Sequence, residues 1–201
     1  MLAAFDFDFD RAMPSDVRIE TLVSGGAVDQ LLPATVPFAL LLTVAAAVVL
    51  SGLAAGFFFA YAANVTLALN GLTGEAYTTV MQPINESVRN PAFAAVFFGA
   101  PAVAALGAVL VLLGGDLLTP YGLLFLLGAG VYLVGTLAVT VVVHLPMNDA
   151  IAAWSPSAPP EEWAAVRARW ARWNLLRTAA ALVSFVAFLA ATVALLARPP
   201  G

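Results

Sequence analysis

The chain has 201 residues, of which 62% are hydrophobic and only 10% are charged. Soluble domains are typically about 45–50% apolar and about 25% charged, so this composition excludes a soluble domain and predicts an integral membrane protein surrounded by a lipid bilayer. The absence of cysteine excludes disulfides, thiolate zinc sites and iron–sulfur clusters, and the net charge of −4 argues against nucleic acid as a partner.

The first 33 residues are the polar end of the chain. Acidic side chains outnumber basic ones there: Asp6, Asp8, Asp10, Asp16, Glu20 and Asp29 stand against Arg11 and Arg18. Residues 5–10 alternate between phenylalanine and aspartate, but no partner strand is visible for them. We therefore predict an acidic, mobile tail over residues 1–33 and a transmembrane bundle over residues 34–201.

Four long stretches without a charged residue follow the tail. They cover residues 30–74, 90–115, 117–143 and 178–197. About 20 residues cross a bilayer, so each stretch is long enough to span it. The first stretch is longer than one span needs, and we place its helix at residues 36–62. The predicted fold class is all-α, an antiparallel bundle of four transmembrane helices with short interfacial helices in the 1–2 and 3–4 connections.

The connection between the first two spans mixes polar and apolar residues at helical spacing. Val80, Ile84 and Val88 recur every four residues, and Tyr77 precedes them by about one turn. This pattern predicts a short amphipathic helix at the membrane interface.

The connection between the third and fourth spans contains a proline-rich break at residues 156–160. Glu161 and Glu162 then fit the first turn of a new helix, where carboxylates are favoured. We expect this helix to run into the fourth span, with Arg167, Arg169 and Arg172 solvated or facing lipid headgroups.

Uncommon polar residues are concentrated on one face of the predicted membrane protein. In an antiparallel bundle, the end of helix 1, the start of helix 2, the end of helix 3 and the start of helix 4 share that face. The residues there are Asn64, Asn70, Gln82, Asn85, Glu86, Arg89, Asn90, His144, Asn148, Asp149, Asn174 and Arg177. We predict that His144, Asn148, Asn174 and Arg177 surround one cavity together with Asn85 or Asn90.

Residue spacing supports this convergence. His144 and Asn148 are four residues apart and share a helix face if Pro146 does not break the turn. A second stripe of one helix consists of Trp170, Trp173, Asn174 and Arg177.

Each candidate also has a purely structural interpretation. His144 could hydrogen-bond a carbonyl at the interface, Arg177 could snorkel to the headgroups, and Asn90 could simply cap a helix. All four tryptophans fall within twenty residues and could form an interfacial belt. Because Trp170 and Trp173 share a stripe with Arg177, we expect at least one of them to line a pocket.

The sequence supports neither a metal site nor a cofactor. With one histidine and no cysteine, only oxygen ligands such as Asp149 or Glu86 are left beside His144. We predict no cofactor, although a haem or metal bound through His144 stays open.

Taken together, the motifs resemble the anthrone oxygenase-like family of small four-helix integral membrane proteins. The matching parts, over residues 36–197, are the glycine-rich first span, Asn85 followed by Asn90-Pro91, His144-Leu-Pro-Met-Asn148 and Trp170-Ala-Arg-Trp173-Asn174-Leu-Leu-Arg177. The acidic tail has no counterpart in this resemblance.

The resemblance implies that an anthrone, a hydrophobic aromatic small molecule, is oxidised to an anthraquinone by molecular oxygen in aromatic polyketide biosynthesis. Under this hypothesis His144 is the base, and Arg177 with Asn148 or Asn174 holds the anionic oxygen. The substrate-binding candidates are Asn85, Asn90, Trp170, Trp173 and Asn174, with Trp173 stacking on the rings. This scheme requires no metal.

A non-enzymatic role is the alternative: a small membrane subunit, or a lipid- or small-molecule-binding module, that uses the same polar cluster. Replacement of His144 would distinguish the two, since only the enzyme depends on it.

The polar face carries five arginines (Arg89, Arg167, Arg169, Arg172 and Arg177) against three elsewhere (Arg11, Arg18 and Arg198). The positive-inside rule therefore places the polar cluster on the cytoplasmic side, in what we expect to be a bacterial plasma membrane.

Overall fold

The computed structural model describes residues 38–198, in which the regular structure is helical apart from one isolated bridge between Ser155 and Ala158. The acidic tail predicted over residues 1–33 lies outside the described residues. The all-α prediction is confirmed for the part of the chain that is described.

Four of the described helices are long and apolar enough to cross a membrane, as predicted: Phe38–Leu69, Pro91–Leu113, Pro120–Ala152 and Trp163–Leu196. The first consists of α4 (Phe38–Ala60), a π-helical turn η1 (Tyr61–Val65) and α5 (Thr66–Leu69). The second is α7 (Pro91–Leu113) and the fourth is α10 (Trp163–Leu196). The third consists of α8 (Pro120–Val131), the π-helical segments η2 (Tyr132–Ala138) and η3 (Thr140–His144), and α9 (Leu145–Ala152).

Three of the four helices are much longer than a bilayer requires. Their lengths are 32, 33 and 34 residues, against 23 for α7. At 1.5 Å per residue, about 20 residues cross the hydrocarbon core, so the longer helices extend roughly 15–20 Å beyond it. The first helix thus continues to Leu69 rather than ending near residue 62, because no glycine or proline interrupts it before Gly71.

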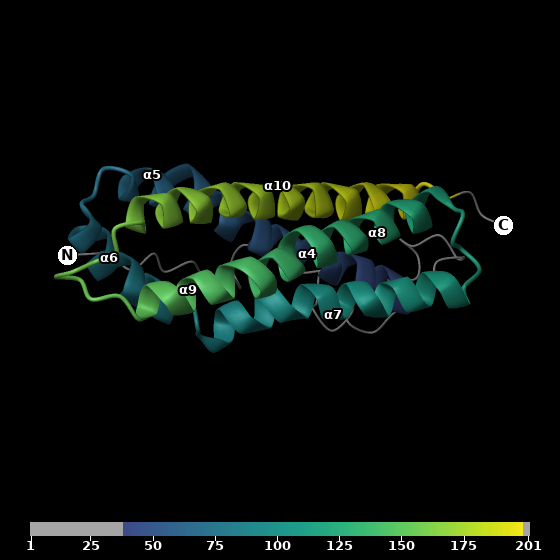
Figure 1. Ribbon diagram of the computed structural model, residues 1–201. Coiled ribbons are helices and arrows are strands. Elements are labelled where there is room, and N and C mark those ends of the chain that lie inside the picture. Colours follow the sequence, from purple (N-terminus) through teal and green to yellow (C-terminus); the bar gives the residue numbers. More distant parts are fainter. Residues whose placement is uncertain (1–37, 199–201) are drawn as a thin grey trace, which may run out of the picture. The chain divides into compact units, whose positions relative to one another are not determined.

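The helix extensions and α6 (Gly74–Ser87) lie at the same end of the bundle (Figure 1). The interfacial helix predicted for the 1–2 connection is thus α6, and the helix predicted for the 3–4 connection forms the first turns of α10. Thr73 caps α6 by accepting a hydrogen bond from the Ala76 amide at 3.3 Å. The buried residues of this end form a hydrophobic cluster of Leu69, Tyr77, Met81, Ile151 and Trp170. We call this cluster the interfacial core.

Within the membrane, small residues let the helices pack closely. The core cluster there contains Ala54, Ala55, Phe58, Phe97, Ala100, Tyr132 and Ala181. Gly107 of α7 faces Phe125 of α8 so closely that an added Cβ would overlap the ring. Small residues that let helices approach closely are typical of helix association in lipid.

Candidate active site

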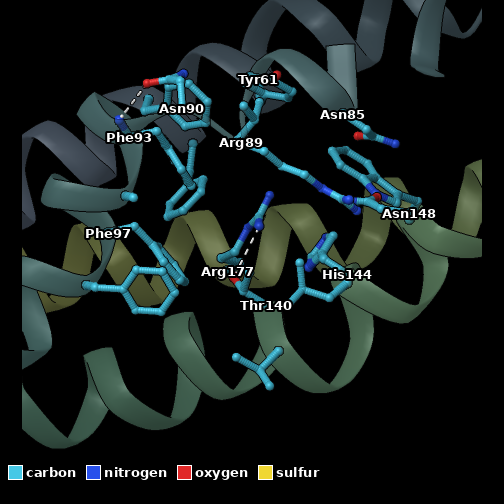
Figure 2. Close-up of a pocket in the computed structure, with 18 of the residues that line it drawn as sticks. Tyr61, Asn85, Arg89, Asn90, Phe93, Phe97, Thr140, His144, Asn148 and Arg177 are labelled. Carbon is cyan, nitrogen blue, oxygen red and sulfur yellow. Dashed lines mark hydrogen bonds between the residues drawn. The ribbon is translucent and has the colours of Figure 1, made fainter. Parts of the chain in front are cut away.

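A cavity of about 510 Å³ lies where α4, α7, η3 and α10 meet, next to the C-terminal end of α6. Its wall is mostly apolar and rich in aromatic rings (Figure 2). The lining residues are Phe57, Phe58, Tyr61, Asn85, Val88, Arg89, Asn90, Pro91, Phe93, Ala94, Phe97, Phe98, Thr140, Val141, His144, Leu145, Asn148, Trp170 and Arg177. A cavity of this volume, apolar with a few polar groups, is typical of a small-molecule site.

Arg177 is the buried charged group of the cavity, whereas Arg89 is exposed at its edge; Arg177 is only 6% exposed, so the snorkelling interpretation does not apply. Its Nη2 donates to Asn174 Oδ1 at 2.7 Å and its Nη1 donates to Thr140 Oγ1 at 3.2 Å. Its Nε has no hydrogen-bond partner among the described residues. The guanidinium carbon lies 4.1 Å from the centre of the Phe58 ring.

Arg177 has no carboxylate partner within the described part of the chain. None of the aspartate and glutamate side chains of residues 38–198 is buried. A buried charge is costly unless it is paired, so an unpaired guanidinium beside a cavity favours a ligand that carries negative charge.

Two neighbouring side chains hold the guanidinium group of Arg177 in place. The Thr140 hydroxyl donates to the Thr136 carbonyl at 2.8 Å, which leaves its lone pairs to accept from the guanidinium. Asn174 is fully buried and does not line the cavity. It therefore lies behind Arg177, as a positioning residue rather than a contact for a ligand.

His144 is 1% exposed and lines the same cavity. Neither of its ring nitrogens has a hydrogen-bond partner among the described residues. Its ring packs edge-on against Trp170, with 5.0 Å between ring centres. Figure 2 shows the side chains of His144 and Arg177 pointing toward the same space.

Asn148 shares the cavity with His144, because the helix continues through Pro146. Proline lacks the amide proton of a helical hydrogen bond and crowds the preceding turn. Here the π-helical turn η3 stands directly before Pro146, where a wider turn accommodates the ring. The Asn148 Oδ1 accepts a hydrogen bond of 2.8 Å from the Trp170 indole, which fixes both side chains.

Two further candidates lie at the polar rim of the cavity. Asn85 lines it with an amide nitrogen that is buried and has no hydrogen-bond partner among the described residues. Asn90 lines it as well, but its amide donates to the Ser87 carbonyl at 2.8 Å and accepts from the Phe93 amide at 2.9 Å. Asn90 is therefore the N-cap of α7, as its structural interpretation predicts.

Outside this rim lies a second, polar pocket of about 340 Å³ that shares Asn85, Arg89 and Asn148 with the cavity. Arg89 donates to Asp149 at 2.7 Å in an exposed ion pair across the rim. We call this region the polar mouth; Figure 2 shows Arg89 extending across it toward Asn148.

Trp173 and Arg167 differ from the expectations drawn from the sequence. Trp173 is half-buried and does not line the cavity. Trp170, the other tryptophan of the same helical stripe, does line it. Arg167 is half-buried and donates to the carbonyls of Leu69, Asn70 and Leu72 rather than facing solvent. The last carbonyls of a helix lack intrahelical partners, and a nearby arginine satisfies them.

Sequence reasoning missed the aromatic wall of the cavity. It consists chiefly of Phe57, Phe58 and Tyr61 on the first helix and Phe93 and Phe97 on the second. Phe93 and Phe97 stack with 5.5 Å between ring centres. The sequence does carry a signal for this wall. Phe57 and Tyr61 are four residues apart, as are Phe93 and Phe97, so each pair shares a helix face near the polar end of its span.

The residues present offer little to a metal ion. Residues 38–198 contain no group of three or more histidine, cysteine, aspartate or glutamate side chains that could hold one. Beside His144, the side-chain oxygens that the cavity offers include the amide oxygens of Asn85 and Asn148.

A family model described as anthrone oxygenase matches residues 90–187 of the chain. The resemblance inferred from the sequence motifs is confirmed over this range, which contains Asn90, His144, Asn148, Trp170, Asn174 and Arg177. The first span and Asn85 lie outside it. No curated protein and no solved structure matches the chain.

Proposed function

We propose that this anthrone oxygenase-like chain is a membrane-embedded oxygenase that oxidises an anthrone-like aromatic substrate of the polyketide type with molecular oxygen. One observation carries the proposal: an imidazole and a guanidinium, both buried and both with unpartnered nitrogens, face one cavity with aromatic walls. A base and a cation in an apolar pocket suit a substrate that becomes an anion as it reacts.

Anthrone has this chemistry. Its methylene carbon is flanked by two aromatic rings, and loss of one proton gives an anion whose charge lies largely on the carbonyl oxygen. We assign proton removal to a ring nitrogen of His144 and stabilisation of the anionic oxygen to Arg177. The low dielectric of a buried site makes the second interaction stronger than it is in water.

The remaining steps of the oxidation need no reactant other than O₂. The electron-rich carbon forms a bond to O₂ and reduces it by two electrons, and the resulting peroxide anion takes up the proton to become a hydroperoxide. Loss of the second proton from that carbon then breaks the O–O bond, so that one oxygen atom stays as the new carbonyl and the other leaves as water. One anthrone and one O₂ thus give one anthraquinone and one water.

The aromatic wall would hold the flat substrate in this scheme. The stacked pair Phe93 and Phe97 and the ring of Trp170 are the candidates for contact with its rings. Asn85 and Asn148 remain candidates for the polar substituents of the substrate, because both lie at the rim. We do not extend the stacking role to Trp173, which does not line the cavity.

The experiment is an oxidation assay with protein purified in detergent, following oxygen uptake and quinone absorbance against a protein-free blank. General acid–base catalysis contributes roughly 10²–10⁴-fold, so His144→Ala should lower the rate by that factor. Arg169→Ala is the matched control, because Arg169 is exposed and does not line the cavity. Full turnover by His144→Ala would remove histidine from the mechanism, and no turnover of any anthrone by the wild type would refute the proposal.

The second candidate is a binding module without catalysis, for lipid or another small molecule. The polar mouth favours it, because Arg89 and the unpartnered amide of Asn85 could meet a headgroup there. Under this alternative, His144→Ala would leave ligand affinity unchanged, whereas Arg89→Ala would reduce it.

The arginine distribution supports a cytoplasmic position for the polar mouth in a bacterial plasma membrane. A reporter fused at residue 160, in the loop before α10, should therefore act in the cytoplasm. A reporter active only on the outside would reverse this orientation and leave the four spans unchanged.

A further inference from the structure

One side of the cavity wall is also part of the membrane-facing surface. Phe98, Val141 and Leu145 all line the cavity and are 58%, 45% and 40% exposed. All three belong to helices that span the membrane. Apolar side chains exposed on such helices contact lipid chains, so the cavity has a side that borders lipid rather than protein.

The helix packing explains the position of this side. α7 packs mainly against α4 and also against α8 and η2, whereas η3 is not among its main packing partners. A π-helical turn holds an extra residue and widens the helix, which changes the direction of the side chains that follow. The cavity lies next to η3, where Thr140, Val141 and His144 line it.

The lipid-facing side and the polar mouth lie at different depths. Phe98 is seven residues after Pro91, the first residue of α7, which places it about 10 Å along the helix. Arg89 and Asp149 form their exposed ion pair before α7 begins. Phe98 therefore lies deeper along the bundle than the ion pair, on the side of the lipid chains.

We propose that the cavity is loaded sideways from the bilayer, by an apolar aromatic ligand that passes between α7 and η3. We call the gap bounded by Phe98, Val141 and Leu145 the lateral opening. An apolar aromatic molecule is concentrated in the bilayer, and this path spares it the charged polar mouth. The chemical class of the ligand rests on the proposed function, whereas the path rests on the exposed wall residues.

Photolabelling of the protein in lipid vesicles tests this path without the need for turnover. The probe is 3-(trifluoromethyl)-3-phenyldiazirine, an apolar aromatic compound that partitions into the bilayer. Light expels N₂ and leaves a carbene that inserts into neighbouring bonds, and mass spectrometry locates the adducts. Phe97 is buried yet lines the cavity, so we expect adducts on it. Phe188 is equally buried but does not line the cavity, and it should stay unlabelled.

Substitutions at two neighbouring positions distinguish entry through the lateral opening from labelling of the lipid-facing surface in general. Val141→Trp fills the opening and should remove most of the adduct on Phe97, whereas Val141→Ala should preserve it. Val142→Trp is the matched control, since Val142 is exposed on the same helix but does not line the cavity. Adducts on Leu176, which is exposed, serve as the reference for insertion, and continued protection of the buried Phe188 reports that each variant is folded.

Three results would overturn the lateral path: no adduct on Phe97 in the wild type, an equal adduct in Val141→Trp, or an adduct that falls only when Arg89→Trp fills the polar mouth. The probe is not a substrate, so failure of the proposed oxidation leaves this test intact. Labelled Phe97 in a protein that oxidises no anthrone would refute the reaction and support the path.

Discussion

Replacing Asn174 with aspartate should separate the stability of the bundle from its ability to hold an anion. The Asn174 Oδ1 already accepts from Arg177 Nη2 at 2.7 Å, so in Asn174→Asp a carboxylate oxygen can accept the same hydrogen bond without new geometry. The variant supplies the buried guanidinium with a carboxylate partner. We expect unchanged or higher thermal stability, together with weaker binding of any ligand that depends on the positive charge of Arg177.

The size of the expected loss in activity follows from the distance between the new carboxylate and the Arg177 guanidinium. A hydrogen bond of this length places the new carboxylate about 4 Å from the guanidinium carbon, where two unit charges interact by about 4 kcal/mol at an effective dielectric constant of about 20. The charge that Arg177 offers to an anionic ligand is then largely neutralised. Each 1.36 kcal/mol is tenfold in rate, so kcat/KM for a reaction through an anion should fall by roughly 10²–10³-fold.

Asn174→Leu is the comparison variant, because it removes the acceptor without adding a charge. A hydrogen bond to a charged group contributes about 1.5–3 kcal/mol, so this variant should unfold at a lower temperature as well as lose activity. The difference in stability between the two variants distinguishes neutralisation of Arg177 from general damage to the bundle.

The assay combines thermal unfolding, anthrone oxidation and the affinity for 9-anthracenecarboxylate, a fluorescent planar aromatic anion. The affinity measurement applies even if the natural substrate is not an anthrone. If Asn174→Asp binds this anion and turns over as well as the wild type does, Arg177 does not serve as an anion partner, and the reasoning from its unpaired charge is wrong.

Three further predictions concern structural residues outside the cavity. Arg167→Ala should lower the free energy of unfolding by about 1–3 kcal/mol, because the carbonyls of Leu69 and Asn70 lose their hydrogen bonds to a charged donor, whereas Arg172→Ala, at an exposed position, should change the chemical-denaturation midpoint little. Gly107→Val should lower the thermal midpoint, since its side chain would overlap an aromatic ring of α8, while Gly56→Ala, in open space, should be tolerated. Burial raises the pKa of Tyr77 from 10.0 to about 12, so the folded state keeps this proton longer than the unfolded state and stability is lost as the pH rises through that range. Tyr77→Phe should lack this part of the alkaline loss; identical pH profiles of wild type and variant in thermal unfolding would contradict the assignment.

The sequence alone determined the number of spans and the end at which the polar residues meet. Both depend on local properties: runs of uncharged residues long enough for a bilayer, and the alternation of direction in an antiparallel bundle. The continuation of the first helix to Leu69 escaped prediction because hydropathy marks where a chain leaves lipid, not where its helix ends.

Only the tertiary structure decided what each polar side chain does there. Asn174 and Trp173 share a helical stripe with Arg177, yet Asn174 lies behind the guanidinium and Trp173 does not line the cavity. The sequence around Arg167 is typical of a surface arginine, but in the folded chain its side chain donates to the carbonyls of Leu69 and Asn70, about a hundred residues earlier. Helical spacing fixes the direction of a side chain only relative to the axis of its own helix. Its contacts depend on how neighbouring helices are rotated and shifted, and in this chain π-helical turns change that rotation beside the cavity.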